Sequence, residues 1–362
     1  MKTRLFNLMA CPECRADLQL HTFALEQDEI VDGALLCPEC RMIYYIVDTV
    51  PRMLPRTLYD NPEFALRYED QLVIIAGEYG TSTASTDRLT QHKQNTSKAF
   101  GDEWETFNRF GYDHDVFQGQ TERNRFYVNT FLQQSDLEGK LYLDGGCGNG
   151  RYSLQSLQQG AEVVAVDLSH AVDTARKNLK EYSDRAHFVQ GDLFKLPFKP
   201  AVFDGAFSIG VLMHTGNTQA AFKSIASHVK RTGLIGISVY QKQNPLHEFN
   251  DWWIRELTIR MPSRALYHLS RWMAGFANLA HRVRLLGLVN AFFRLEPYHL
   301  CVYDWYKAPV AHHHTRDEVQ HWFEDVGAGE ILHDDTPEFD HRGPIRKWIW
   351  PRCGFTVRGR LT

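Results

Sequence analysis

The sequence lacks any apolar run that approaches the roughly 20 residues needed to cross a membrane as a helix. It also lacks an excess of positive charge, since 40 lysines and arginines stand against 44 aspartates and glutamates. The formal net charge is -4 and the isoelectric point is about 6.5. An acidic chain has no overall field that attracts nucleic acid or anionic lipid, so any such contact must be local.

Cysteine is scarce, and four of the seven cysteines fall in two Cys-Pro-Glu-Cys pairs near the start of the chain. Two such pairs offer four thiolates, which suit the tetrahedral geometry of zinc. A redox dithiol would instead stand alone near a βαβ unit. We therefore expect a structural Zn²⁺ site and a reducing, cytoplasmic location. The expected metal ligands are Cys11, Cys14, Cys37 and Cys40.

The dinucleotide fingerprint Gly-x-Gly-x-x-Gly is also missing, because Arg151 stands where its last glycine belongs. What is present is an apolar strand ending in Asp144, followed by glycines at 145, 146, 148 and 150. Glycines in such a turn let the backbone approach a ligand at the start of a helix. Three later strand patterns, 161–167, 187–192 and 203–210, also end in polar residues, and a parallel sheet would gather these ends in one crevice.

These four motifs, taken in order, resemble those of the class I S-adenosylmethionine-dependent methyltransferases, over about residues 100–240 and again from 314. The resemblance implies an α/β fold with a doubly wound, seven-stranded mixed sheet. It also implies that Asp144 and the glycine turn hold the methionine part of S-adenosylmethionine, Asp167 the ribose and Asp192 the adenine. The alternative is a generic doubly wound domain whose strand-end acids only cap helices. The cofactor-binding residues implied are Asp144, Gly145, Gly146, Cys147, Gly148, Gly150, Asp167, Leu168, Asp192, Leu193, Ser208 and Ile209.

The cysteine pairs lie among short strand-like runs at 17–20, 42–47 and 50–55. This arrangement resembles the zinc ribbon of the small activator subunit that partners eukaryotic tRNA, rRNA and protein methyltransferases. A weaker likeness is to the bacterial guanine-N1 rRNA methyltransferases, whose ligand set includes a histidine. Six basic and eight acidic residues in 1–56 argue against an RNA reader. We expect a packing module or substrate-side wall with a core separate from that of the catalytic domain.

The pattern divides the chain into five parts: a zinc ribbon (1–56), a linker and helical lid segment (57–135), the cofactor half of the core (136–240), a helical insertion on the acceptor side (241–311), and a C-terminal helix with the closing strand pair (312–362). Residues 77–96 are rich in serine, threonine and glycine, which predicts a loop or mobile linker. The closing strand is expected at 345–357, paired with 329–333.

Phe100, Trp104 and Phe107 recur at helical spacing and resemble an aromatic segment that closes over the cofactor in a bacterial branch of the family. The alternative is an ordinary apolar helix face. In the next helical pattern, Arg123 and Tyr127 are candidates to reach the cofactor carboxylate, or else lie on an exposed face.

The expected insertion is basic and aromatic: residues 251–300 hold seven arginines and three acidic residues. It could be a membrane-surface helix, a lid over a hydrophobic acceptor, an RNA face, or a helical subdomain with its arginines in water. We expect it to form the acceptor side of the site, with one of His312 to His314 facing the acceptor. Its expected apolar wall consists of Trp252, Trp253, Trp272 and Phe276.

Methyl transfer requires alignment of the acceptor and, for some acceptors, removal of a proton. His214, in the turn after 203–210, is the candidate catalytic residue, as a general base or an orienting group; it could instead cap a helix or pack under the lid. The Asn-Pro-Pro-Tyr motif of amino methyltransferases is absent.

The function expected is methyl transfer to an oxygen, nitrogen or carbon of a small-molecule, lipid-like or glycan acceptor. The first alternative is an rRNA or tRNA methyltransferase that uses the ribbon and the arginine-rich insertion. The second is a non-enzymatic scaffold, against which the glycine turn and Asp167 argue. Nothing in the sequence names the acceptor or the oligomeric state.

Overall fold

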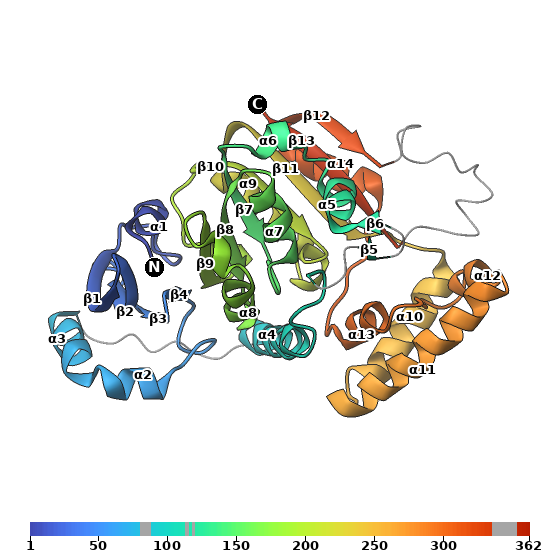
Figure 1. Ribbon diagram of the computed structural model, residues 1–362, viewed down its shortest axis with the longest axis horizontal. Coiled ribbons are helices and arrows are strands. Elements are labelled where there is room, and N and C mark those ends of the chain that lie inside the picture. The colour runs from blue at the N-terminus through green and yellow to red at the C-terminus, as the bar shows by residue number, and fades with distance from the viewer. Residues whose placement is uncertain (80–87, 113–115, 118–119, 335–352) are drawn as a thin grey trace.

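One mixed sheet of eleven strands runs through the molecule, in the order β1-β2-β3-β4-β9-β8-β7-β10-β11-β13-β12 (Figure 1). The computed structural model describes residues 1–79, 88–112, 116–117, 120–334 and 353–362. Strands β5 and β6 form a separate two-stranded sheet. The strands are β1 Gln19–Glu26, β2 Glu29–Leu36, β3 Ile43–Val47, β4 Val50–Met53, β5 Val116–Phe117, β6 Gln120–Thr121, β7 Leu141–Gly145, β8 Glu162–Asp167, β9 Ala186–Gly191, β10 Phe203–Ile209, β11 Val229–Tyr240, β12 Ala328–His333 and β13 Gly354–Leu361.

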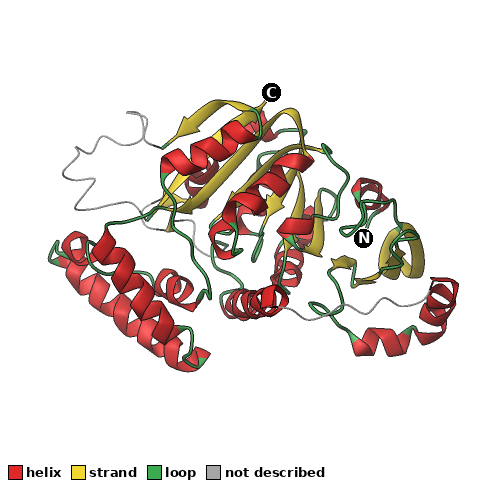
Figure 2. Cartoon of the chain, turned by 180° about the vertical axis from the view of Figure 1, so that it is seen from behind, coloured by secondary structure: helices red, strands yellow, loops and turns green. Residues whose placement is uncertain are grey.

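Helices cover both faces of the parallel part of the sheet, as the alternating sequence pattern requires (Figure 2). Helices α5, α7 and α8 pack on one face, and α9 and α14 on the other. The helices are α1 Thr3–Leu8, α2 Pro62–Arg67, α3 Glu69–Tyr79, α4 Arg88–Thr106, α5 Glu122–Thr130, α6 Gln134–Leu137, α7 Arg151–Gln158, α8 Ala171–Asn178, α9 Thr218–His228, α10 Pro245–Thr258, α11 Ser263–Arg282, α12 Leu286–Asn290, α13 His299–Lys307 and α14 Arg316–Asp325.

The central strands β9, β8, β7, β10 and β11 are parallel, and β13 joins β11 in the antiparallel sense. All five residues of β7 are buried, as expected for a strand covered on both faces. This is the doubly wound α/β arrangement with a mixed edge that the motifs imply. Its strands place Asp144, Asp167 and Asp192 at the same carboxyl edge.

The prediction of seven strands is wrong, because four strands of the N-terminal ribbon extend the sheet. Strand β4 pairs in parallel with β9, with Arg52 opposite Gln190 and Met53 opposite Gly191. Without this pairing β9 would be an edge strand with unpaired N–H and C=O groups. The ribbon therefore covers the free edge of the cofactor half.

The expectation of separate cores is wrong too. Leu35, Tyr44 and Ile46 of the ribbon belong to the same apolar cluster as Val189 and Phe198 of the cofactor half.

A buried arginine adds a polar contact between these two parts. Arg52 is almost fully buried and donates to both carboxylate oxygens of Asp173, at 2.7 and 3.0 Å, and to Gln190 Oε1 at 3.1 Å. Such a bidentate pair fixes orientation as well as distance. Backbone pairing, apolar packing and the ion pair between Arg52 and Asp173 thus hold the ribbon to the cofactor half.

Between β11 and α14, helices α10 to α13 form a lobe at the opposite end of the molecule from the ribbon (Figure 1). Helix α13 packs on both α10 and α11. Within the described residues, no helix is long and apolar enough to span a bilayer.

The segment 77–96 is partly helical: α3 reaches Tyr79 and α4 begins at Arg88, while 80–87 lie outside the described residues. The loop prediction is therefore wrong for 88–96. Strand β12 occupies the place predicted at 329–333 and pairs with β13. Of the predicted closing strand 345–357, residues 345–352 lie outside the described residues, and β13 begins at Gly354.

Candidate active site

A cavity of about 180 Å³ lies at the carboxyl edge of the parallel strands, under helix α4. Nine of the predicted cofactor-binding and catalytic residues line it, although they come from four separate turns. Its glycine, acidic and apolar surfaces are contributed by β7, β8, β9 and β10, and its cover by α4 and α13. The nine residues are Gly146, Cys147, Gly148, Asp167, Leu168, Asp192, Leu193, Ile209 and His214.

Two glycines of the turn after β7 have no room for a side chain. Gly146 has φ +93°, and a Cβ there would lie 2.3 Å from the side chain of Val211. Gly148 has φ +53°, and its Cβ would lie 2.8 Å from the indole of Trp104 in α4. Both the backbone conformation and the close approach therefore require glycine. The turn is tight because α4 and the turn after β10 press on it.

Asp167 ends β8 and holds the glycine turn in place. Its Oδ2 accepts from the Gly148 N–H at 2.9 Å, and its Oδ1 accepts from the Ser169 N–H and hydroxyl at 2.8 and 2.7 Å. Burial raises the pKa of the Asp167 carboxyl above its usual value. A carboxylate offers about four acceptor positions, so Oδ2 keeps capacity for a donor from a ligand in the cavity.

Asp192 follows β9, and each of its carboxylate oxygens has a partner. Its Oδ1 accepts from the Phe194 N–H at 3.0 Å, and its Oδ2 forms an ion pair with Lys93 of α4 at 2.5 Å. Lys93 was not predicted, since no local pattern links it to an acid 99 residues away. Together with the bond from the Ser97 hydroxyl to the Leu168 carbonyl, this pair fastens α4 over the cavity.

Four of the predicted cofactor-binding residues do not line the cavity: Asp144, Gly145, Gly150 and Ser208. Asp144 is buried and accepts from the Ser153 hydroxyl at 2.5 Å, and burial raises the pKa of its carboxyl to about 7. The Ser208 hydroxyl donates to the Gly145 carbonyl at 2.6 Å. Gly150 precedes α7 with φ +86°. These residues support the conformation of the turn and do not face the cavity.

His214 lies in the short helical turn after β10, and its side chain is 3% exposed. Its Nδ1 lies 2.6 Å from the Val310 carbonyl, which can only accept, so Nδ1 carries the proton. Its Nε2 is buried without a hydrogen-bond partner, in a residue that lines the cavity. Burial lowers the pKa of His214 to about 3, so the ring is neutral and Nε2 is a free acceptor.

Charged residues of both signs line the same cavity and were not predicted as site residues. Glu103 of α4 and Asp304 of α13 face it, with Arg125 and Arg151. Burial, and secondly the charge of Asp304, raises the pKa of Glu103 well above its usual value; burial raises that of Asp304 to about 6. One sequence signal was available for Glu103: it shares a helix face with Phe100, Trp104 and Phe107, and a carboxylate on an apolar face is unusual.

The aromatic segment divides between two surfaces. Phe100 and Trp104 line the cavity, whereas Phe107 packs against Tyr267 and Tyr303 of the insertion. Arg123 does not line the cavity, and its guanidinium donates a hydrogen bond to Gln134 Oε1 on the surface. Arg125, two residues later, lines the cavity.

The insertion borders the cavity, but not with the residues predicted. Its lining residues are Leu300, Cys301 and Asp304 of α13. Helix α11 turns small residues such as Ala274 and Ala277 inward, whereas its Trp272 and Phe276 face outward. The predicted wall of Trp252, Trp253, Trp272 and Phe276 is therefore wrong: all four are exposed.

None of the three adjacent histidines lines the cavity either. His313 pairs with Glu248 at 2.6 Å, and His314 with Glu318 at 3.6 Å and the Thr218 hydroxyl at 2.8 Å. All three border a second hollow beside α10 instead. The prediction that one of them faces the acceptor is wrong for this cavity.

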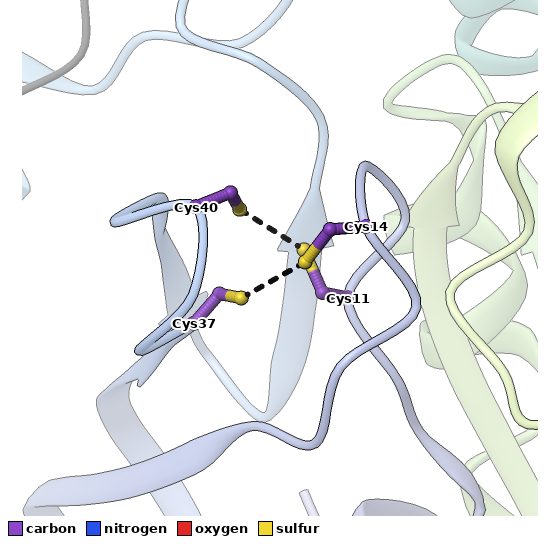
Figure 3. A group of neighbouring side chains, drawn as sticks. All are labelled: Cys11, Cys14, Cys37 and Cys40. Atoms are coloured by element: carbon purple, nitrogen blue, oxygen red, sulfur yellow. Dashed lines mark hydrogen bonds between the residues drawn. The ribbon is translucent and has the colours of Figure 1, made fainter.

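The four N-terminal cysteines converge in the ribbon (Figure 3). Their sulfur atoms all lie within 4.8 Å of one another. Each Cys-x-x-Cys pair contacts the other: the sulfur atoms of Cys11 and Cys40 lie 3.4 Å apart, and those of Cys14 and Cys37 lie 3.3 Å apart. Four sulfurs at about 2.3 Å from a zinc ion would stand roughly 3.8 Å apart, so the cluster fits a tetrahedral site.

Comparison with known families gives two matches. Residues 143–237 match the family described as a methyltransferase domain, and residues 2–48 match the family described as Trm112p-like protein. Residues 143–237 therefore form a methyltransferase domain. The ribbon is the Trm112p-like part, in agreement with the predicted resemblance to a methyltransferase activator.

Two curated relatives illustrate the similarity. The chain is 28% identical over 174 residues to the sterol 24-C-methyltransferase of Pneumocystis carinii, covering 44% of this chain and 45% of that one. It is 30% identical over 144 residues to the ubiquinone biosynthesis O-methyltransferase of Rickettsia akari, covering 38% and 55%. The chain thus spans about half the length of these relatives.

A solved complex between the Haloferax volcanii Trm112 methyltransferase activator and a putative methyltransferase is similar at 14% identity and a TM-score of 0.40, covering 72% of this chain and 97% of that one.

Proposed function

We propose that the protein transfers a methyl group from S-adenosylmethionine to an oxygen, nitrogen or carbon atom of a small-molecule, lipid-like or glycan acceptor. The observation that carries this proposal is a single cavity that holds both kinds of group the reaction needs. Asp167 and Asp192 stand beside the glycine turn, and the free Nε2 of His214 faces the same space.

The residues present fit the cofactor's polar groups. Asp167 keeps an acceptor position for a ribose hydroxyl, and Asp192 with Leu193 offers a carboxylate and an apolar surface for adenine. Glu103 and Asp304 suit an ammonium group, and Arg125 and Arg151 suit a carboxylate. The ribbon cysteines would hold one structural zinc ion, in agreement with their all-thiolate geometry.

Bound S-adenosylmethionine would supply an electrophilic methyl group, whose bond to sulfur breaks as the acceptor's nucleophile bonds to the methyl carbon, with the thioether S-adenosylhomocysteine as leaving group. The protein then has to align the acceptor, exclude water and accept a hydrogen bond from the attacking group. His214 suits the last task because its Nε2 is a buried lone pair with no competing donor. Phe100, Trp104 and Leu300 supply apolar surface that excludes water.

The lowered pKa of His214 favours one of its two predicted roles. A base with a pKa of about 3 is too weak to hold a proton at neutral pH. We therefore assign His214 as an orienting hydrogen-bond acceptor for an O–H or N–H group of the acceptor.

The variant His214→Asn is expected to lower the rate of methyl transfer about 10- to 100-fold, because one buried, orienting hydrogen bond is lost. Affinity for S-adenosylhomocysteine should change less than about threefold. His228→Asn is the matched control, since His228 is also buried, its pKa is also lowered by burial, and it does not line the cavity. Equal losses in both variants would mean that His214 acts through stability alone.

The pH dependence separates the two roles further. If His214 is neutral throughout, the ratio of wild-type to His214→Asn rates should stay constant from pH 6 to 8. A ratio that rises with pH through the ordinary histidine range, near 6.5, would assign a general base instead.

An RNA acceptor is the second candidate, and the Trm112p-like match favours it. Binding of RNA through phosphate contacts would weaken steeply as salt rises, with a slope set by the number of contacts. A steep slope together with methyl incorporation into RNA would replace the proposed acceptor class.

A further inference from the structure

Exposed apolar side chains are concentrated in the helical lobe. Of the 21 large hydrophobic side chains that are exposed in the described part of the chain, 15 lie between residues 246 and 298. Single exposed leucines are common on proteins, but this concentration in one short stretch of the chain points to an interaction surface. On α10 and α11 they include Leu246, Phe249, Trp252, Trp253, Leu257, Trp272, Phe276 and Leu279.

Helix α11 carries the clearest pattern. Trp272, Phe276, Leu279 and Val283 follow one another at spacings of four, three and four residues, which places them in one outward ridge. Trp272 is 70% exposed, and its ring stacks on that of Phe276 with centroids 6.2 Å apart. Inward-facing residues such as Leu266 and Ala277 already pack the helix against the lobe. The ridge is therefore not needed to hold α11 in place.

A basic stripe runs beside this ridge. Arg264, Arg271 and Arg282 recur at spacings of seven and eleven residues on α11, and all three are exposed. Among the described residues, none of them has an ion pair with a carboxylate. The surrounding segment 251–300 holds seven arginines and three acids in a chain of net charge -4, so positive charge is concentrated here.

We propose that the outward face of α11, defined by the ridge and the basic stripe, docks on the surface of an anionic lipid bilayer. A helix with an apolar ridge and an adjacent arginine stripe lies in the plane of the interface, with aromatic rings among the lipid chains and arginines at the headgroups. An RNA face would use the arginines but would leave the Leu279 and Val283 side chains uncovered, which favours a bilayer over RNA. The positive charge of the stripe favours an anionic surface over a neutral or basic partner.

The surface adjoins the cavity through α13. This helix packs against α11 on one side and lines the cavity with Leu300, Cys301 and Asp304 on the other. Docking would bring the acceptor side of the cavity close to the membrane. The proposal of membrane binding itself does not depend on the proposed methyl transfer.

Co-sedimentation of the full chain with vesicles tests this directly. Vesicles of phosphatidylcholine with phosphatidylglycerol should bind the protein, vesicles of phosphatidylcholine alone should bind it much less, and added salt should release it. The double variant Trp272→Ser with Phe276→Ser should weaken binding at least tenfold, because the ridge loses its two largest side chains. Each of Arg264→Gln, Arg271→Gln and Arg282→Gln should cost about fivefold on anionic vesicles only.

The matched control is Val73→Ser with Ile74→Ser on α3, which removes two exposed apolar side chains far from the lobe. This control should bind vesicles like the unchanged protein. Affinity for S-adenosylhomocysteine should be the same in all variants, which shows that they are folded. Absence of vesicle binding, or equal loss in the control, would overturn the proposal. So would a dimer in light scattering that disappears with Trp272→Ser and Phe276→Ser, because a second copy would then cover the ridge.

Discussion

Replacing Asp167 with alanine is expected to weaken binding of S-adenosylhomocysteine by on the order of 1.5 to 3 kcal/mol, or about 10- to 150-fold. Two losses combine in this variant. The ligand loses a charged acceptor, and the Gly148 N–H and the Ser169 N–H and hydroxyl lose the carboxylate that orders the turn. Calorimetric titration of the purified chain measures the change.

Asp167→Asn separates these two losses, because its amide oxygen keeps one acceptor for the turn while the charge is removed. We expect an intermediate affinity for Asp167→Asn. Asp184→Asn is the control, because its exposed side chain lies outside the cavity and should leave affinity unchanged. Unchanged affinity in Asp167→Ala would rule out this residue as a cofactor ligand.

Cys37→Ser is expected to abolish stoichiometric zinc and to lower the thermal midpoint of the whole chain by roughly 5 °C or more, since structural zinc binding contributes to folding free energy. The effect should reach the cofactor half because the two parts share one sheet and one apolar cluster. Arg52 adds a direct contact, through Asp173 and Gln190. Zinc analysis and calorimetric unfolding give both quantities.

Cys353→Ser is the matched control, because Cys353 is a half-buried free thiol outside the zinc cluster. It should keep its zinc and its midpoint. If Cys37→Ser instead gives two separate transitions, with the larger one unchanged, the ribbon would be an independent domain after all.

The local parts of the site could be predicted from the sequence because each is encoded within a few residues. An apolar strand followed by glycines specifies the turn at 145–150, and two Cys-x-x-Cys pairs specify the metal cluster. The position of His214 after β10 follows from the same logic. These signals depend only on backbone geometry and ligand chemistry.

The parts that were missed depend on contacts between distant segments. Pairing of β4 with β9 joins residues 138 positions apart, and no local pattern specifies which free edge a ribbon will cover. The same holds for Lys93 and Asp192. The aromatic residues of α11 were misassigned because helical spacing defines a face but not which face is buried; the small residues opposite were the available signal.

The most direct test of the central claim is calorimetric titration of S-adenosylhomocysteine into the zinc-loaded full chain, beside a titration of a nicotinamide dinucleotide. We expect one S-adenosylhomocysteine molecule per chain, because the cavity at the carboxyl edge contains one glycine turn with one set of strand-end carboxylates. No heat is expected from the dinucleotide, because Arg151 occupies the position of the fingerprint's last glycine. Binding of the dinucleotide, or no binding of S-adenosylhomocysteine to a folded, zinc-loaded chain, would contradict it.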